Sequence, residues 1–335
     1  MRLITFAEAI REALDFVMKN DRRVIVLGEG VDDPQGTFGT TLGLKDSYGA
    51  KRVIDMPLAE NAATGIAIGA CLAGLLPIAV HQRMDFLLLA MDQIVNHAAK
   101  LSYMFGGKFC VPLTIRCTVG MAGGMAGQHS QNLHALFTHI PGLKVVMPAT
   151  AYDAKGLLLS SICDQNPVIF IENFHLYKMQ QDVPRGAYFI PLGKGAVRRK
   201  GKDVTAVSFS IMLHRTLEAA SILEGDGIDT EVIDLRTLSP LDEELILKSV
   251  KKTGRLVIIE PAVESCGFAA EITARVQAKL FLRLKCPIKR ISFPNSPPPA
   301  AASLEKLYYP EADKIARIIS GIFNGTGKYT LKGTS

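Results

Sequence analysis

The sequence lacks the long hydrophobic runs and paired cysteines that mark several protein classes. No apolar run reaches the roughly 20 residues needed to span a bilayer without a charge or a turn. The first residues lead into a capped amphipathic helix over 6–19, which is the pattern of a folded domain and not of a signal peptide. None of the 6 cysteines forms a CxxC pair and most lie in apolar or small-residue surroundings, so we expect free, buried thiols in a reducing compartment, the cytoplasm.

Clustered positive charge with interleaved aromatic residues is absent too. The net charge of +6 is spread along the chain, and the densest basic run, 198–202, contains no aromatic residue. We therefore expect a solvated turn there and no nucleic-acid binding. The glycine-rich segment 120–130 has neither the GxGxxG pattern nor the Lys-Ser/Thr end of a P-loop, which argues against both kinds of phosphate-binding loop.

What the sequence does contain is a regular alternation of apolar runs and helical patterns. At 335 residues the chain is long enough for two domains. Apolar runs that alternate with helices predict an α/β fold, with mostly parallel sheets covered by helices on both faces. We expect a first domain over 1–185, a second over 195–325, and an irregular linker at about 173–193. The expected helices cover 6–19, 63–74, 86–104, 153–163, 215–223, 243–252, 268–279 and 310–323, and the expected strands cover 24–27, 52–54, 76–80, 111–117, 143–148, 168–172, 204–209, 230–234, 256–260 and 288–291.

Candidate site residues follow the expected strands, because ligands of such sheets bind beyond the carboxyl ends of the strands. Glu60 precedes the helix of small residues at 63–74, which we expect to be buried on all sides. The positive end of the helix dipole favours a carboxylate there, and the same acid is costly to bury without a partner. Glu60 is therefore either a site residue or a charge that merely caps a core helix.

His129 follows the glycine-rich segment at an expected helix start. Repeated glycine suggests a backbone that folds tightly or moves. Histidine gains and loses protons near neutral pH, so His129 is a candidate catalyst. The alternative is a packed or capping histidine.

Five separated segments together resemble one family. Their order and spacing are similar to the beta subunit of the thiamine-diphosphate-dependent, decarboxylating component of 2-oxo acid dehydrogenase complexes, over about residues 3–322. The resemblance implies a pyrimidine-binding domain followed by a transketolase-type C-terminal domain. The segments are 56–60, 90–100, 127–131, 139–148 and 233–242.

The resemblance also implies roles for individual residues. Glu60 matches the carboxyl that shares a proton with ring nitrogen N1′ of the cofactor, so that the aminopyrimidine can deprotonate C2 of the thiazolium ring. Phe86 matches the aromatic that stacks on the pyrimidine, and the alternative for it is a plain core residue. His129 matches the histidine that lines the reaction centre, and Glu29 matches an acid near Glu60. The cofactor-binding positions implied in this way are Glu29, Leu58, Glu60, Gln82 and Phe86.

A potassium site is implied as well. Leu113, Ser161, Asp164 and Asn166 match positions that hold this ion in the family, largely through backbone carbonyls. Hard oxygen ligands without His or Cys suit that class of ion. The alternative is an ordinary Asp-x-Asn-Pro turn that closes a helix.

The magnesium motif of the superfamily, Gly-Asp-Gly followed by Asn, has no counterpart at a suitable place. Gly225-Asp226-Gly227 falls between a helix and a strand of the second domain, no suitable Asn follows before Asn295, and we interpret it as a tight turn. Magnesium and the diphosphate half of the site are therefore expected on an alpha subunit, in an α2β2 tetramer. The acyl group is expected to pass to the lipoyl arm of a partner acyltransferase, and the chain alone is not expected to bind the cofactor tightly.

The loop at 81–85 is more charged than is usual in the family. Arg83 and Asp85 form either a structural ion pair or part of a site for a polar substrate, since Arg grips carboxylate or phosphate well. Pyruvate, a branched-chain 2-oxo acid and acetoin all remain as substrates. Two rival functions are a two-chain transketolase or acyloin synthase, and a non-catalytic scaffold subunit, against which Glu60, Phe86 and His129 argue.

Overall fold

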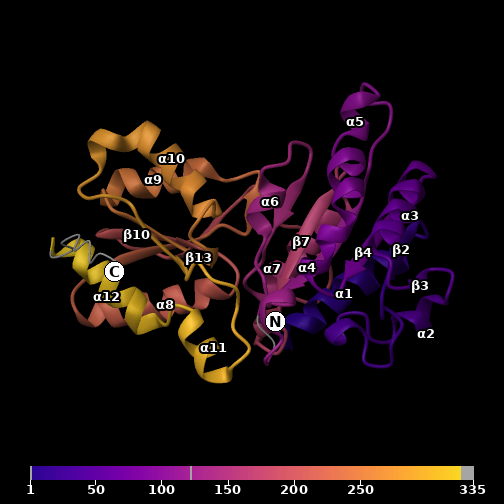
Figure 1. Ribbon diagram of the computed structural model, residues 1–335, viewed down its shortest axis with the longest axis horizontal. Helices are drawn as coiled ribbons and strands as arrows, with labels where there is room; N and C mark the ends of the chain where they lie inside the picture. Colours follow the sequence, from indigo (N-terminus) through magenta and orange to yellow (C-terminus); the bar gives the residue numbers. More distant parts are fainter. Residues whose placement is uncertain (1, 121–122, 326–335) are drawn as a thin grey trace. The chain divides into compact units, whose positions relative to one another are not determined.

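The computed structural model describes residues 2–120 and 123–325 (Figure 1). The chain divides into two compact units, and each of them is built on its own sheet. The first comprises Met1–Lys194, Arg236–Leu241 and Pro297–Lys306, and the second comprises Gly195–Leu235, Asp242–Ser296 and Leu307–Ser335. The predicted α/β fold is confirmed. Among the described residues, no helix is both long and apolar enough to cross a bilayer.

A seven-stranded sheet forms the core of the first unit, in the order β12-β6-β7-β5-β4-β2-β3. All neighbours are parallel except β12 and β6. Three of the central strands, β2, β5 and β7, are buried at every position, as expected for strands covered on both faces. The strands are β2 (Val24–Gly28), β3 (Val53–Asp55), β4 (Leu76–His81), β5 (Thr114–Val119), β6 (Lys144–Val146), β7 (Val168–Asn173) and β12 (Thr237–Ser239).

Helices α1 and α7 pack against each other, and α3 packs on β4 (Figure 1). Helix α1 starts at a capping box, in which Thr5 and Glu8 satisfy each other's backbone amides. The helices of this unit are α1 (Phe6–Asn20), α2 (Leu44–Tyr48), α3 (Glu60–Leu72), α4 (Met84–Leu87), α5 (Leu101–Met104), α6 (His134–Thr138) and α7 (Ala151–Ile162), with 3₁₀ turns at Thr37–Gly39, Leu88–Ala90, Ala126–Gln128 and Phe174–Leu176.

Two helix predictions for this unit were wrong in part. The single helix expected over 86–104 is a succession of α4, a 3₁₀ turn, a π-helix at Gln93–Ala98 and α5. Apolar spacing does not distinguish these helix types, because they differ in hydrogen-bond register. Helix α3 is not buried on all sides, since Ile66 is 55% exposed. Small residues permit close packing, but this chain covers only one face of α3.

Strand β1 (Arg2–Thr5) pairs antiparallel with β8 (Gln180–Val183), from Arg2 opposite Val183 to Thr5 opposite Gln180. Strand β8 lies inside the stretch that was predicted to be irregular. Antiparallel pairs this short carry little hydrophobic signal, so the sequence pattern did not reveal either strand.

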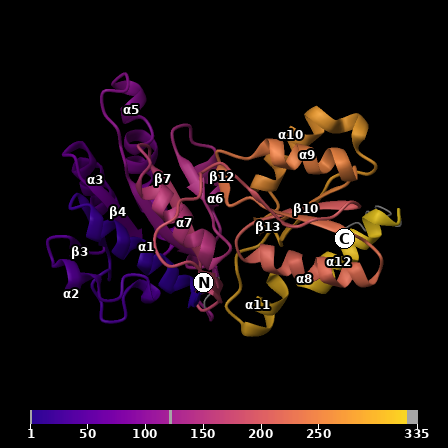
Figure 2. The same cartoon turned by 180° about the vertical axis from the view of Figure 1, so that it is seen from behind.

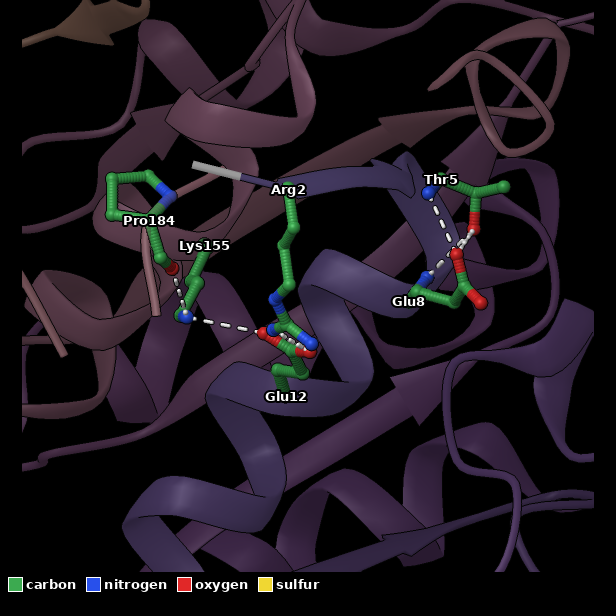
Figure 3. Close-up of polar contacts among 6 residues, drawn as sticks. All are labelled: Arg2, Thr5, Glu8, Glu12, Lys155 and Pro184. Carbon is green, nitrogen blue, oxygen red and sulfur yellow. Dashed lines mark hydrogen bonds and ion pairs between the residues drawn. The ribbon is translucent and has the colours of Figure 1, made fainter. Parts of the chain in front are cut away.

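A buried lysine ties these two strands to the helices (Figure 3). Lys155 of α7, 3% exposed, donates from Nζ to Glu12 Oε2 at 3.1 Å and to the carbonyl of Pro184 at 3.2 Å. Arg2 of β1 forms an ion pair with the same Glu12. A buried ammonium persists only with such partners.

The second unit contains a five-stranded sheet in the order β14-β13-β10-β11-β9, in which only the edge strand β9 is antiparallel. Helices α9 and α10 lie on one face of this sheet and α8 and α12 on the other, as both views show (Figures 1 and 2). The elements are β9 (Ala196–Arg199), β10 (Val204–Ser208), α8 (Ile211–Gly225), β11 (Thr230–Asp234), α9 (Glu243–Thr253), β13 (Leu256–Val263), α10 (Phe268–Leu280), a 3₁₀ turn at Phe281–Arg283, β14 (Lys289–Phe293) and α12 (Ala312–Phe323). Helix α11 (Ala302–Tyr308) begins in the part of the chain that belongs to the first unit.

Candidate functional site

A pocket lies at the carboxyl ends of β2, β3 and β4 in the first unit. Three loops converge there because neighbouring parallel strands end at the same edge of the sheet. All five of the predicted cofactor-binding residues line this pocket: Glu29, Leu58, Glu60, Gln82 and Phe86.

Close packing and hydrogen bonds fix the loops around the pocket. A Cβ on Gly28, the last residue of β2, would lie 2.2 Å from the carbonyl oxygen of Val80, so only glycine lets β4 approach there. The Gln82 amide donates to the carbonyl of Glu29 at 2.8 Å. The amide of Gly30 donates to Asp55 Oδ1 at 2.8 Å. The loops after all three strands are therefore tied to their neighbours.

Two carboxyl groups face this pocket. Glu60 is the first residue of α3 and is half-buried. Its side chain makes no hydrogen bond or ion pair with the residues that the structure describes. The pKa of Glu29 is raised by its partial burial and then by the negative charges of Glu60 and Asp55. Like charges at short range disfavour double ionisation, so the pair suits a ligand that brings a proton-bearing nitrogen.

Two histidines accompany the carboxyl groups. His81, at the end of β4, lines the pocket, and burial lowers its pKa to about 4, so it is neutral at pH 7. Its Nε2 lies 3.2 Å from Thr64 Oγ1. His129 meets Phe86 edge to face, with ring centroids 5.0 Å apart and planes at 89°. His129 follows a 3₁₀ turn instead of starting a helix, so that part of its prediction was wrong.

Sequence reasoning did not assign a role to Gly28 or His81. A glycine that ends an apolar strand, and a histidine that ends the next one, are the only signals in the sequence. Both become meaningful once strand order makes β2 and β4 neighbours.

Arg83 and Asp85 are hydrogen-bonded to different partners. Arg83 donates to the carbonyl of Gly120 at 2.9 Å and to Met125 Sδ at 3.0 Å. Asp85 Oδ1 accepts from the backbone amide of Gln131 at 3.2 Å and from its side-chain amide at 2.9 Å. The hydrogen bonds of Arg83 and Asp85 therefore go to other residues, and neither residue donates to or accepts from the other in them.

The predicted cation positions lie near the amino ends of β5 and β7. Leu113 is fully buried, and Ser161 donates to a carbonyl of its own helix. Asp164 Oδ1 accepts from the backbone and side-chain amides of Asn166 at 2.9 and 3.1 Å, and its Oδ2 pairs with Lys144. Burial raises the pKa of Asp164, but the bonds from Lys144 and Asn166 outweigh this and lower it. The side chains thus form the Asp-x-Asn turn that was the alternative prediction.

The Gly225-Asp226-Gly227 sequence lies at the end of α8, in the second unit. Residues 2–120 and 123–325 contain no cluster of three or more His, Cys, Asp or Glu residues arranged to hold a metal ion. Gly225 ends α8, and Asp226 and Gly227 donate to carbonyls of its last turn at 3.0 and 3.1 Å. The interpretation of Gly225-Asp226-Gly227 as a tight turn is confirmed.

A buried polar network lies two strands further along the same sheet. Arg116 of β5 donates from Nε and from a terminal nitrogen to the two oxygens of Glu172 of β7, at 2.6 and 2.9 Å. Both side chains are 1% exposed. Tyr177 donates to Glu172 at 2.9 Å and lies 2.8 Å from the Thr118 hydroxyl. The sequence concealed this network because Arg116 lies inside an otherwise apolar strand.

Comparisons with known proteins agree with this architecture. The profile described as "Transketolase, pyrimidine binding domain" matches residues 2–180, and that of "Transketolase, C-terminal domain" matches residues 193–315. A solved structure titled "Split gene transketolase, inactive beta4 tetramer" aligns with a TM-score of 0.77 at 24% identity, over 96% of this chain and 98% of that one, which speaks for the fold alone. Fold and strand-end pocket together define a transketolase-type protein.

Curated relatives narrow the family further. The beta subunit of acetoin:2,6-dichlorophenolindophenol oxidoreductase of Cupriavidus necator is 47% identical over 324 residues, covering 94% of this chain and 96% of the relative. The pyruvate dehydrogenase E1 component subunit beta of Rickettsia felis is 46% identical over 316 residues, covering 94% and 97%. The chain belongs to this family of beta subunits of thiamine-diphosphate-dependent 2-oxo acid dehydrogenases, and the resemblance seen in the sequence is confirmed.

Proposed function

We propose that this chain is the beta subunit of an enzyme that oxidatively decarboxylates pyruvate or a related 2-oxo acid and passes the acyl group to a lipoyl domain. The relatives named above support this reaction class. The observation that carries the proposal is the convergence of Glu60, Glu29 and Phe86 on one pocket. The six cysteines are all free, which supports a reducing, cytoplasmic location, although the expectation that they are buried was wrong for all but Cys71 and Cys117.

The pocket fits the aminopyrimidine half of thiamine diphosphate. That half is a flat aromatic ring with a basic nitrogen, and Phe86 offers an apolar ring face for it. Glu60 offers a carboxyl that no described residue neutralises. When bound there, thiamine diphosphate would supply the nucleophilic carbon centre that the decarboxylation of a 2-oxo acid needs.

The residues of this chain would each have a separate task. Glu60 would share a proton with ring nitrogen N1′, and Glu29 would favour that shared state, because its own pKa is raised by burial and by Glu60. Leu58 and Gln82 would line the ring edge from two neighbouring loops. His129, against Phe86, would orient the substrate carboxylate or handle a proton during acyl transfer.

Replacing Glu60 by Gln tests the catalytic proposal. The amide keeps the size of the side chain but cannot hold the proton, so we expect turnover to fall by about a hundredfold or more while the complex still assembles. The measurement is steady-state turnover of the complex purified with its natural partner. Unchanged turnover would instead support the scaffold alternative.

The diphosphate and magnesium are proposed to be held by an alpha subunit in an α2β2 tetramer. Two observations support a partner on the first unit. The described residues contain no cluster of His, Cys, Asp or Glu that could hold a metal ion, and one face of α3 is exposed, with Ile66 55% exposed. Isothermal titration of the chain alone with thiamine diphosphate and magnesium should show no tight binding. Tight, magnesium-dependent binding by the lone chain would contradict this division of the site.

The substrate is tested by a direct screen. The assembled complex is assayed with pyruvate, branched-chain 2-oxo acids and acetoin, using a lipoylated carrier domain or a dye as acceptor. Aldehyde acceptors without a carrier form the second arm. Activity only in the second arm would favour a two-chain transketolase or acyloin synthase.

Potassium is the remaining cofactor proposal, held by carbonyls of Leu113, Ser161, Asp164 and Asn166. The backbone bond from Val168 to the Leu113 carbonyl supports it by bringing Leu113 beside the Asp164–Asn166 turn. Potassium-selective stabilisation over sodium in thermal unfolding would support this site, and equal stabilisation by both ions would contradict it.

A further inference from the structure

Three consecutive residues, Arg83 and the first two residues of the short helix α4, bind described residues of the segment 120–133. The first of them, Arg83, holds its amino-terminal part through the carbonyl of Gly120 at 2.9 Å and Met125 Sδ at 3.0 Å. Arg83 is only 3% exposed, and its guanidinium lies over the rings of Phe38 and Phe174 at 5.9 and 5.5 Å. An arginine stacked and bonded in this way is a tether, and it is not presented to a soluble substrate.

The next two residues hold the carboxyl-terminal part of the same segment. Met84 Sδ accepts from the amide of Leu133 at 3.2 Å. Asp85 Oδ1 accepts from both amides of Gln131, at 3.2 and 2.9 Å. Asp85 is 7% exposed, so these bonds form largely out of water, where their loss is costly.

Several described residues of this segment have an unusual backbone conformation. The φ angles of Gly120, Gly124 and Ala126 are 96°, 84° and 54°, in the left-handed region. For Ala126 this conformation is strained, and it persists only where surrounding contacts enforce it. Among the described residues of 120–133, the only regular element is the 3₁₀ turn Ala126–Gln128.

One predicted cofactor-binding residue, Phe86, and one catalytic candidate, His129, lie next to these tethers. Phe86 directly follows Asp85, and His129 lies two residues before Gln131. Their rings are in edge-to-face contact at 5.0 Å. The bonds between Gln131 and Asp85 therefore hold the residues around His129 beside Phe86, which lines the pocket.

We propose that Asp85 is a positioning residue, which acts through Gln131 to set His129 against Phe86, while Arg83 anchors the other end of the segment. This inference rests on the proposed function, since it assigns Asp85 a role in that reaction. It replaces both earlier interpretations of the charged loop at 81–85, the mutual ion pair and the polar-substrate site.

Three variants of the assembled complex test this role. Asp85→Ala should lower kcat by about ten- to a hundredfold, because a small misplacement of a catalytic group is enough for such a loss. The KM for thiamine diphosphate should change by less than about threefold, since pocket residues are untouched. Asp85→Asn keeps an acceptor oxygen for the Gln131 amides and should restore most of the activity. Asp21→Ala, at the opposite end of β2, is the matched control and should leave kcat unchanged.

A double-mutant cycle separates positioning from general support of the fold. In a His129→Ala background, Asp85→Ala should reduce kcat by less than about threefold further, because coupled residues are not additive. An equal loss in both backgrounds, or full activity of Asp85→Ala, would overturn the proposal. If Asp85→Ala does not fold, Gln131→Ala breaks the side-chain bond from the other partner, and the same cycle applies. Normal turnover of Glu60→Gln would instead count against the proposed function itself.

Discussion

Two glutamates at the carboxyl edge of one sheet have opposite surroundings. Glu172, at the end of β7, is 1% exposed and accepts hydrogen bonds from Arg116 and Tyr177. Glu60, after β3, is half-buried and makes no polar contact with described residues. A buried charge must be neutralised by the chain when its role is structural. A carboxyl at a pocket that is left without a partner is available for a ligand.

The largest effect is expected from Glu172→Gln. The change leaves the buried guanidinium of Arg116 without its counter-charge, and removing one member of such a pair costs about 3–5 kcal/mol of unfolding free energy. Urea denaturation followed by circular dichroism measures this. A loss of unfolding free energy below 1 kcal/mol would mean that the Glu172–Arg116 network does not have the structural role assigned to it.

A smaller effect is expected from His81, which belongs to the pocket but is buried like Glu172. Its pKa is about 4 in the folded protein and about 6.5 when unfolded, so the unfolded chain binds more protons between these values. Stability should therefore fall as the pH drops from 6.5 to 4, by about 3 kcal/mol from this residue. The pH dependence of unfolding for His81→Gln should be flatter by that amount, and identical profiles would contradict the assignment.

The smallest effect on stability is expected from Glu60→Gln. A half-exposed side chain without partners should change the unfolding free energy by no more than about 0.5 kcal/mol. The same denaturation experiment serves as the control for Glu172→Gln. The comparison would fail if both substitutions destabilised the fold equally.

The sequence predicted the secondary structure of the fold better than it predicted the contacts between elements. Apolar runs such as 168–172 predicted the central strands, because strands buried on both faces leave an unbroken hydrophobic signature. Strands β1 and β8 were missed, since their short pairing leaves no such signature. Helix α3 was wrongly expected to be buried on all sides, because the sequence cannot say whether its neighbours belong to the same chain.

The sequence predicted which loops form the candidate site, but it did not predict the hydrogen bonds and close contacts that hold these loops together. Strand alternation alone placed Glu29, Glu60 and the loop at 81–86 at one edge of the sheet. The hydrogen bonds that Gln131 donates to Asp85 join residues 46 positions apart, and no local sequence pattern predicts them. Gly28 shows the same limit, because its role depends on the neighbouring Val80.

The pairing of β1 with β8 has a consequence for synthesis of the chain. Residues 2–5 are synthesised well before their pairing partners at 180–183. Closing so long a loop is slow compared with local helix formation. Strand β1 therefore stays unpaired until 180–183 have been synthesised, and only then can Lys155 bridge Glu12 and the carbonyl of Pro184.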